Sequence, residues 1–308
     1  MEETTQKKVI ALGFFDGVHL GHGALLKRTV ELAKALNAVP AAHTFAQHPS
    51  TLVTHQPTPL LSTPEDRAYL MKSLYGIQEV IAAPFDRDMM TMPWEDFVTD
   101  YLVGGLHCVG VVVGHDYRFG YKGEGTPSRL KALCGKLSIS CEVVEKVTLD
   151  GRTVSSTYIR SLVEEGDMET ACRYLGHPHL VRGQVRHGKG LGRTLGFPTV
   201  NIVPAEGILL PAYGVYATKV TLEDGRTYPA ATNVGIRPTV EDEKRPTVEA
   251  FLLDFQGDVY GQTVSLEFYR RLRGERRFDS LEDLRREVMK NAAQTREYFT
   301  GIPTSEQD

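Results

Sequence analysis

Long apolar runs are missing from this 308-residue sequence, and none approaches the roughly 18 residues that a membrane-spanning helix requires. The opening "MEETTQKK" is not followed by the apolar core of a signal peptide. The net charge of −4 argues against a broad surface for nucleic acid. We therefore expect a cytoplasmic protein with neither a membrane partner nor a nucleic-acid partner.

Cysteine is scarce as well, and no two cysteines form a C-x-x-C pair. We expect reduced, mostly buried thiols, as is usual in the cytoplasm. The cysteines are Cys108, Cys134, Cys141 and Cys172. Hydrophobic residues make up 41% and charged residues 24% of the chain, which is typical of a globular protein. The length suits two domains, each long enough to bury its own core.

The first half alternates between two patterns. Apolar runs of five to nine residues indicate buried strands, and stretches with apolar residues at helical spacing indicate amphipathic helices between them. Thr63 as N-cap, Pro64 after it and Gly76 delimit one such helix. Strands separated by helices predict a parallel sheet with helices on both faces, which binds ligands at the carboxyl ends of its strands. The expected strands are 7–15, 38–45, 78–85, 108–116 and 140–147, and the expected helices are 21–37, 63–76, 93–106 and 128–137.

The pattern changes after Pro178, where β-like runs separated by glycine and proline begin. Two short helices joined at Gly166 and Asp167 precede this change, and a helix that starts with the capping pair Ser280 and Asp283 ends it. We expect one domain over residues 1–180 and a small antiparallel β-barrel with a terminal helix over residues 181–308. The turn-rich segment 46–66 is expected to be an exposed active-site loop.

The stretch "FFDGVHLGH", residues 14–22, joins the first strand to the first helix. The first N–H groups of a helix are unpaired and the helix dipole is positive there, so His19, Gly21 and His22 occupy a candidate anion site. A polyphosphate beside these imidazoles would raise their pKa and favour charged hydrogen bonds. Two surface histidines, or a metal-binding pair, are the alternative interpretations.

A second polar segment is "VSSTYIR". Ser155, Ser156 and Thr157 precede a helix and can either cap it or hold phosphate. Arg160 lies one turn further and can bind phosphate with two parallel hydrogen bonds, although a surface arginine is the default interpretation.

The second half contains its own candidate residues. Gly188, Gly190 and Gly196 belong to a glycine-rich segment that is either a flexible turn or a cradle for phosphates, and it does not match a P-loop. Thr199 and Asn201 share one face of a β-like run and offer oxygen atoms that suit Mg²⁺, although polar residues on a solvent-exposed face are the alternative interpretation. Glu249 is a lone carboxylate in an apolar strand, so it either faces solvent or has a chemical role.

Taken together, these motifs resemble one known family. "GFFDGVHLGH" resembles the H-x-G-H loop of nucleotidyltransferases, and with "TFAQHP", "VVVGHDYRFG" and "VSSTYIR" it resembles the bacterial bifunctional riboflavin kinases/FAD synthetases. "GFPTVN", "NVGIRPT", "VEAFLLDF", "DVYG" and "LRGERRF" resemble the kinase module of that family in the expected order. The resemblance covers about 290 residues, and it implies a Rossmann-like nucleotidyltransferase domain followed by a β-barrel riboflavin kinase domain.

The resemblance also implies a role for each site residue. His19 and His22 would hold the phosphates of ATP, opposite Arg160, while FMN is adenylylated to FAD. Glu249 would be the general base that deprotonates the 5′-hydroxyl of riboflavin, and Thr199 and Asn201 would bind Mg²⁺ and ATP. The remaining implied substrate-binding residues are Gly13, Phe15, Asp16, Gly21, His48, Ser155, Ser156, Thr157, Gly188, Gly190 and Gly196. The implied ligands are ATP, Mg²⁺, riboflavin, FMN and FAD, bound by a monomer or weak homo-oligomer.

Four residues depart from the family pattern: Phe14, Gln47, Tyr158 and Asn291. Gln47 and Tyr158 belong to the adenylyltransferase half. They leave open a second hypothesis, a riboflavin kinase whose adenylyltransferase half is weakened or altered. A third hypothesis is a flavin-binding carrier without catalysis. Phe45, Tyr117, Phe119 and the loop around His48 are candidates to stack on the flavin ring, although such aromatics are more often part of a core.

Overall fold

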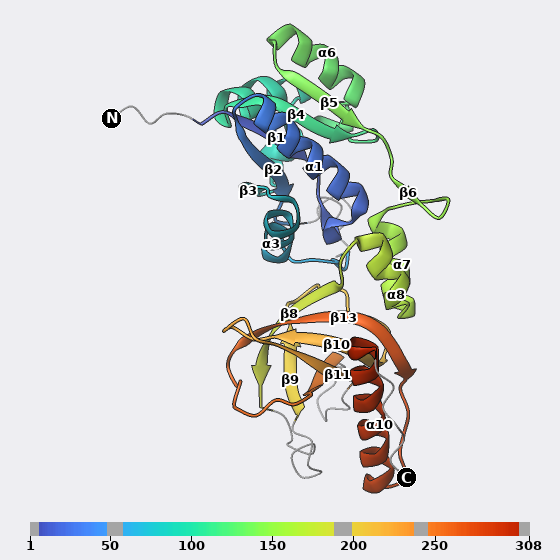
Figure 1. The fold of residues 1–308 in the computed structure, drawn as a ribbon. Coiled ribbons are helices and arrows are strands. Elements are labelled where there is room, and N and C mark those ends of the chain that lie inside the picture. Colours follow the sequence, from blue (N-terminus) through green and yellow to red (C-terminus); the bar gives the residue numbers. More distant parts are fainter. Residues whose placement is uncertain (1–5, 48–57, 188–198, 237–245, 302–308) are drawn as a thin grey trace. The chain divides into compact units, whose positions relative to one another are not determined.

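The computed structural model describes residues 6–47, 58–187, 199–236 and 246–301. The chain forms two compact units, residues 1–156 and 157–308, and each is described by itself (Figure 1). Within the described residues, no helix combines the length and the apolar character needed to cross a membrane.

The first unit is built on a parallel sheet with the strand order β3-β2-β1-β4-β5. Every strand pair in it is parallel, so the expected βαβ units are confirmed. The order reverses between β1 and β4, and ligands of such sheets bind outside the carboxyl ends of the strands at that point. The strands are β1 Lys8–Leu12, β2 Val39–Phe45, β3 Glu79–Ala83, β4 Cys108–Gly114 and β5 Ser140–Val144.

Helices cover both faces of this sheet, as predicted (Figure 1). Alternate residues of a strand point to opposite faces. Val9 packs with Leu32 of α1 on one face, whereas Ile10 packs with Leu102 and Leu130 on the other. The helices are α1 Leu20–Ala35, α3 Pro64–Tyr75, α4 Arg87–Thr91, α5 Trp94–Asp96, the π-helical η2 Phe97–Gly105 and α6 Pro127–Leu137.

The limits of α3 are those that the sequence predicts. The Thr63 hydroxyl accepts a hydrogen bond from the Asp66 N–H, Pro64 begins the helix and Gly76 ends it in a left-handed conformation. Close packing of α1 on α3 depends on Gly23, because a Cβ there would lie 2.5 Å from the Tyr75 hydroxyl.

The second unit contains a closed antiparallel barrel with the order β10-β11-β12-β9-β8-β13. Its core is formed by the inward face of each strand, and the predicted β-barrel is confirmed. The strands are β8 His179–Arg186, β9 Thr199–Pro204, β10 Gly214–Thr221, β11 Thr227–Ile236, β12 Pro246–Leu252 and β13 Thr263–Gly274.

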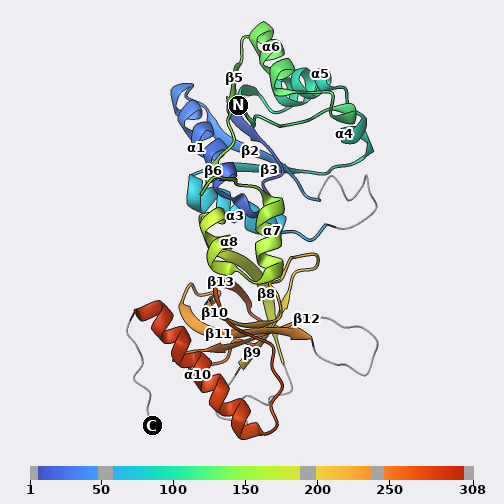
Figure 2. The ribbon, with the colours of Figure 1, turned by 90° about the vertical axis from the view of Figure 1, so that its right-hand side faces the viewer.

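Three helices accompany the barrel: α7 Ser156–Glu165, α8 Met168–Leu175 and α10 Leu281–Thr300. The terminal helix α10 packs on β10 and β11 (Figure 2). Ser280 caps it by accepting a hydrogen bond from the Asp283 N–H, as its sequence predicts. The division between the compact units falls at residues 156 and 157, and the domain boundary near residue 180 stays a prediction.

Candidate active sites

The candidate adenylyltransferase site begins where β1 ends. The chain leaves Leu12, passes through a 3₁₀ turn, η1 Asp16–Val18, and enters α1. Phe15 and Val18 both have positive φ angles, 57° and 43°. This conformation is strained for bulky side chains and persists only where the surroundings enforce it. The loop before α1 is therefore held in one defined shape.

Asp16 is one of the groups that hold this shape. Its buried carboxylate accepts hydrogen bonds from the N–H groups of Leu61 and Ser62, at 2.9 and 3.1 Å. The Ser62 hydroxyl in turn accepts a hydrogen bond from the Gly17 N–H at 2.9 Å. The carboxylate thus ties the loop to the segment before α3, and its predicted contact with substrate stays a prediction.

The two histidines lie together at the start of α1. His19 is the N-cap residue, and its Nδ1 accepts a hydrogen bond from the His22 N–H at 3.2 Å. Their rings stack with centroids 3.5 Å apart. The His22 Nδ1 is buried, and no residue in the described part of the chain forms a hydrogen bond with it. Burial lowers the pKa of His22 well below its usual value of 6.5, and nearby His19 and Arg67 lower it further. His22 is therefore neutral at pH 7.

The serine segment reaches the same loop. The Ser156 hydroxyl donates a hydrogen bond to the Asp16 carbonyl at 3.0 Å, and the Val154 carbonyl lies 3.7 Å from where a Cβ on Gly21 would be. The structure thus brings this predicted phosphate-binding segment to the histidine loop. Thr157 and Arg160 lie on α7 in the second compact unit, and their approach to the histidines stays a prediction.

An apolar cavity of about 420 Å³ opens at the carboxyl ends of the strands. It brings together all three aromatic candidates for flavin stacking, Phe45, Tyr117 and Phe119, with Gly13 and Phe14 of the histidine loop. Tyr117 stacks on Phe119 with ring centroids 5.6 Å apart. The full lining is Gly13, Phe14, Phe45, Phe85, Met89, Met90, Phe97, Asp116, Tyr117, Arg118, Phe119, Gly120 and Gly123.

Sequence reasoning missed one buried cation beside this loop. Arg67 of α3 is fully buried, and its Nη1 donates to the Phe14 carbonyl at 2.6 Å and to the Thr44 hydroxyl at 2.9 Å. Its guanidinium lies 4.2 Å from the centre of the Phe14 ring. Burial lowers the pKa of Arg67 to about 10, which leaves it charged at neutral pH. The helix is evident from the sequence, but nothing in its periodicity marks this side chain as buried.

The candidate kinase site lies on the outer face of the barrel. Glu249 of β12 pairs with Asn201 of β9 on one side and with Asn233 of β11 on the other. Val248 and Ala250, which flank Glu249, are buried in the barrel, so Glu249 points outward. Side chains directly opposite on paired strands lie within about 5 Å of each other at Cβ. The register therefore places a carboxylate between two carboxamides.

Thr199 joins the same face, because it is two residues from Asn201 and pairs with Phe251 of β12. The register thus places Thr199, Asn201 and Glu249 on one face, and their roles in binding and catalysis stay predictions. Four further predicted site residues lie outside the described residues: His48, Gly188, Gly190 and Gly196.

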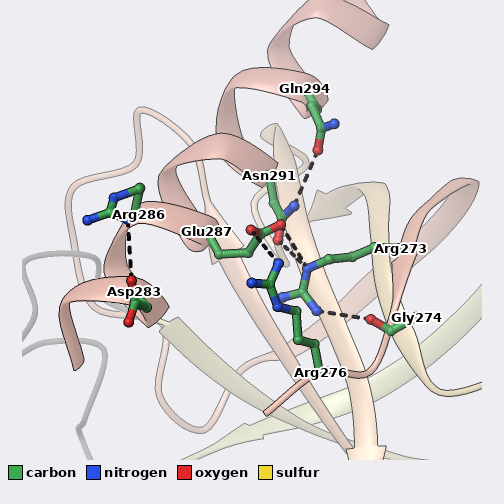
Figure 3. Close-up of polar contacts among 8 residues, drawn as sticks. All are labelled: Arg273, Gly274, Arg276, Asp283, Arg286, Glu287, Asn291 and Gln294. Carbon is green, nitrogen blue, oxygen red and sulfur yellow. Dashed lines mark hydrogen bonds and ion pairs between the residues drawn. The ribbon is translucent and has the colours of Figure 1, made fainter. Parts of the chain in front are cut away.

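A network of charges anchors the "GERRF" segment next to this face (Figure 3). Glu287 of α10 lies 3.4 Å from Arg273 Nε and 3.3 Å from Arg276 Nη1. Arg273 also donates to the Asn291 carboxamide oxygen at 3.1 Å. Glu275 lies between these two arginines in the sequence. Its carboxylate occupies the space that a side chain at position 235 would need, where the chain has Gly235. The segment after β13 is thus tied to α10, and its residue Glu275 lies close to the side chain of Asn233.

The four departures from the family pattern occupy different settings. Phe14 lines the apolar cavity under Arg67, and Asn291 is part of the α10 network. Tyr158 packs edge-on against Tyr174. Gln47 is exposed and lines a second surface cavity with Phe85.

Comparisons with known proteins support the same division of the chain. The sequence profile of the family described as FAD synthetase matches residues 1–158, and that of riboflavin kinase matches residues 175–299. A bifunctional riboflavin kinase/FMN adenylyltransferase of Bacillus subtilis (strain 168) is 33% identical over 307 residues, which are 98% of this chain and 96% of that protein. The protein of the same description from Listeria monocytogenes is 36% identical over 304 residues, 98% of this chain and 95% of its own length.

A solved structure shares the architecture. It is a protein from Streptococcus pneumoniae described as a macrolide-efflux protein, with a TM-score of 0.85, 28% identity and 95% of each chain covered. The two profiles and the near full-length relatives agree with the parallel sheet and the barrel described above. The chain therefore belongs to the bifunctional riboflavin kinase/FMN adenylyltransferase family, with both the FAD synthetase and the riboflavin kinase module.

Proposed function

We propose that the two reactions of this family are carried by two separate sets of residues in this chain. As a family member, the chain is a transferase with both activities. One reaction transfers the γ-phosphoryl group of ATP to riboflavin and gives FMN and ADP. The other joins FMN to the AMP part of ATP and gives FAD and pyrophosphate. The observation that carries the residue assignment is the outward row of Asn201, Glu249 and Asn233 in one unit and the paired histidines of α1 in the other.

Glu249 is the base of the kinase reaction. It takes the proton from the riboflavin 5′-hydroxyl, whose oxygen then attacks the γ-phosphorus as the bond to ADP breaks. Thr199 and Asn201 offer hydroxyl and carboxamide oxygens, which suit a hard cation such as Mg²⁺. Bound Mg²⁺ would neutralise charge on the phosphates of ATP. Gly188, Gly190 and Gly196 supply backbone N–H groups to the same phosphates.

His19 and His22 act in the adenylyltransferase reaction. A phosphate oxygen of FMN attacks the α-phosphorus of ATP, and pyrophosphate leaves. FMN and ATP are both anions, and the site must bring them together and hold them in the reactive orientation. It does so by binding the phosphates that leave as pyrophosphate at the start of α1. Phosphate binding favours protonation of the histidines, so their charge is greatest when the pyrophosphate forms. Ser155, Ser156, Thr157 and Arg160 bind the phosphates from the opposite side, and Gly13, Phe15, Asp16, Gly21 and His48 shape the site.

The apolar cavity holds the flavin ring of FMN. Its aromatic lining suits a flat ring system, and Gly13 and Phe14 connect it directly to the histidine loop. We place the adenylyltransferase domain at residues 1–180 and the kinase domain at 181–308. We further propose that the protein works in the cytoplasm as a monomer or weak homo-oligomer, without a nucleic-acid partner.

A single incubation tests the assignment of function. The protein is mixed with riboflavin, ATP and Mg²⁺, and the flavins are separated chromatographically. FAD is the expected product. FMN alone would indicate a kinase with an altered adenylyltransferase half, and unchanged riboflavin would indicate a carrier.

A further inference from the structure

The row on the outer face of the barrel contains one polar side chain to which the kinase reaction above gives no role. Asn233 of β11 pairs with Glu249 across the sheet, on the side away from Asn201. Its neighbours Thr232 and Val234 are buried, whereas Asn233 is only partly buried. Asn233 therefore points outward, next to the carboxylate.

The side chain of Asn233 is a carboxamide, which can both donate and accept hydrogen bonds. Among the described parts of the chain, no hydrogen bond involves its side chain. On one side, the space next to the Asn233 side chain is filled by Glu275. Both the Asn233 Nδ2, at 3.5 Å, and the Glu275 carboxylate lie close to the position that a Cβ on Gly235 would take. The carboxamide thus sits between Glu249 and the anchored segment after β13.

We propose that Asn233 binds a hydroxyl of the ribityl chain of riboflavin and so aligns the 5′-hydroxyl with Glu249. The proposal rests on the assignment of Glu249 as the base. Thr199 and Asn201 place the phosphates of ATP on the β9 side of Glu249. In-line transfer requires the alcohol to approach from the other side of the transferred group, which is the side of Asn233.

The chemistry of the carboxamide matches this ligand better than a phosphate. Each ribityl hydroxyl both donates and accepts a hydrogen bond, and a carboxamide offers one acceptor oxygen and two N–H donors. A phosphate on this side would face the carboxylates of Glu249 and Glu275. Within the described residues, strand register also places Arg186 of β8 beside Asn201, at the end of the row away from Asn233.

The test combines variants of Asn233 with altered substrates in the full-length protein. We expect Asn233→Ala to raise the KM for riboflavin roughly tenfold, the usual effect of one lost hydrogen bond, with the KM for ATP nearly unchanged. Riboflavin analogues that each lack one ribityl hydroxyl other than the 5′-hydroxyl are then compared. For the analogue that lacks the hydroxyl bound by Asn233, the KM of Asn233→Ala should differ little from the KM of the wild type. Thr227→Val, at the far end of β11, is the matched control.

Two results would overturn the proposal. One is a rise in the KM for ATP instead of riboflavin. The other is an equal loss for riboflavin and every analogue, which indicates a structural role only. If Asn233→Ala lowers the melting temperature, Asn233→Ser carries the same comparison. Failure of the underlying assignment is seen separately, because wild type would then form no FMN or Glu249→Gln would keep full activity.

Discussion

His19 accepts a hydrogen bond from the backbone N–H of His22, so one histidine caps the helix that carries the other. The cap uses Nδ1 of His19, and in our proposal its Nε2 donates to a phosphate of ATP. The two rings stack on each other at the positive end of α1. We propose that His19 combines capping with phosphate binding, and variants can separate these two roles.

Replacement of His19 by alanine or asparagine separates the two roles. We expect His19→Ala to destabilise the first unit by about 1 kcal/mol and to abolish FAD formation, because both the cap and the donor are lost. His19→Asn keeps a good N-cap, so stability should return while FAD formation stays low. Thermal unfolding and a FAD assay with supplied FMN measure both. Recovery of FAD formation in His19→Asn would mean that only the cap matters.

Acid should destabilise the first unit through a second histidine. His43 of β2 is fully buried, with Nε2 3.0 Å from the Tyr101 hydroxyl, and burial lowers its pKa to about 4 from 6.5. Between these values the unfolded chain binds a proton that the folded chain does not, so stability is full above pH 6.5 and falls towards pH 4. The shift corresponds to at most about 3 kcal/mol.

The double variant His43→Leu/Tyr101→Phe removes this group without leaving an unpaired hydroxyl. Its unfolding free energy, measured by denaturant titration from pH 4 to 7, should depend less on pH than that of wild type. Part of the dependence should remain, because the pKa of His22 is lowered as well. An unchanged pH dependence would contradict the assignment to His43.

Arg67 is expected to matter both for substrate affinity and for stability. Arg67→Met removes a buried charge, but it also takes the guanidinium donor away from the Phe14 carbonyl and the Thr44 hydroxyl, which should cost about 1–3 kcal/mol of stability. The Phe14 ring and carbonyl lose their contacts with the guanidinium, so the KM for FMN in FAD formation should rise. A large loss of stability with an unchanged KM would show a purely structural role.

The network on α10 should support only the kinase reaction. Glu287→Gln weakens the ion pairs to Arg273 and Arg276, which hold the segment beside Asn233 (Figure 3). We expect FMN formation to slow several-fold, at a cost in stability of about 1 kcal/mol or less. FAD formation from supplied FMN should not change. Arg286→Gln breaks an exposed pair on the same helix and serves as the control. Equal effects of both variants would contradict this role.

Capping residues and helix-ending glycines in the sequence predicted the limits of the helices well. Thr63, Pro64 and Gly76 delimit α3 as expected, and Ser280 caps α10. The helix expected at 93–106 is instead a short α-helix followed by the π-helical η2. Helical spacing of apolar residues does not distinguish these hydrogen-bond patterns.

The candidate sites were predictable only in part, because a sequence motif identifies residues but does not show which residues lie next to them in the fold. The motifs indicated His19, His22 and Glu249. The contact of Arg67 with Phe14 joins residues 53 apart, and the pairing of Asn233 with Glu249 depends on strand register. Both are tertiary relationships that no local pattern encodes.

The central claim is that one chain holds two independent sites, and paired variants test it most directly. Each protein is assayed for FMN formation from riboflavin and for FAD formation from supplied FMN. We predict that His22→Ala loses FAD formation and keeps FMN formation, and that Glu249→Gln does the reverse. Loss of both activities in either folded variant would contradict the account.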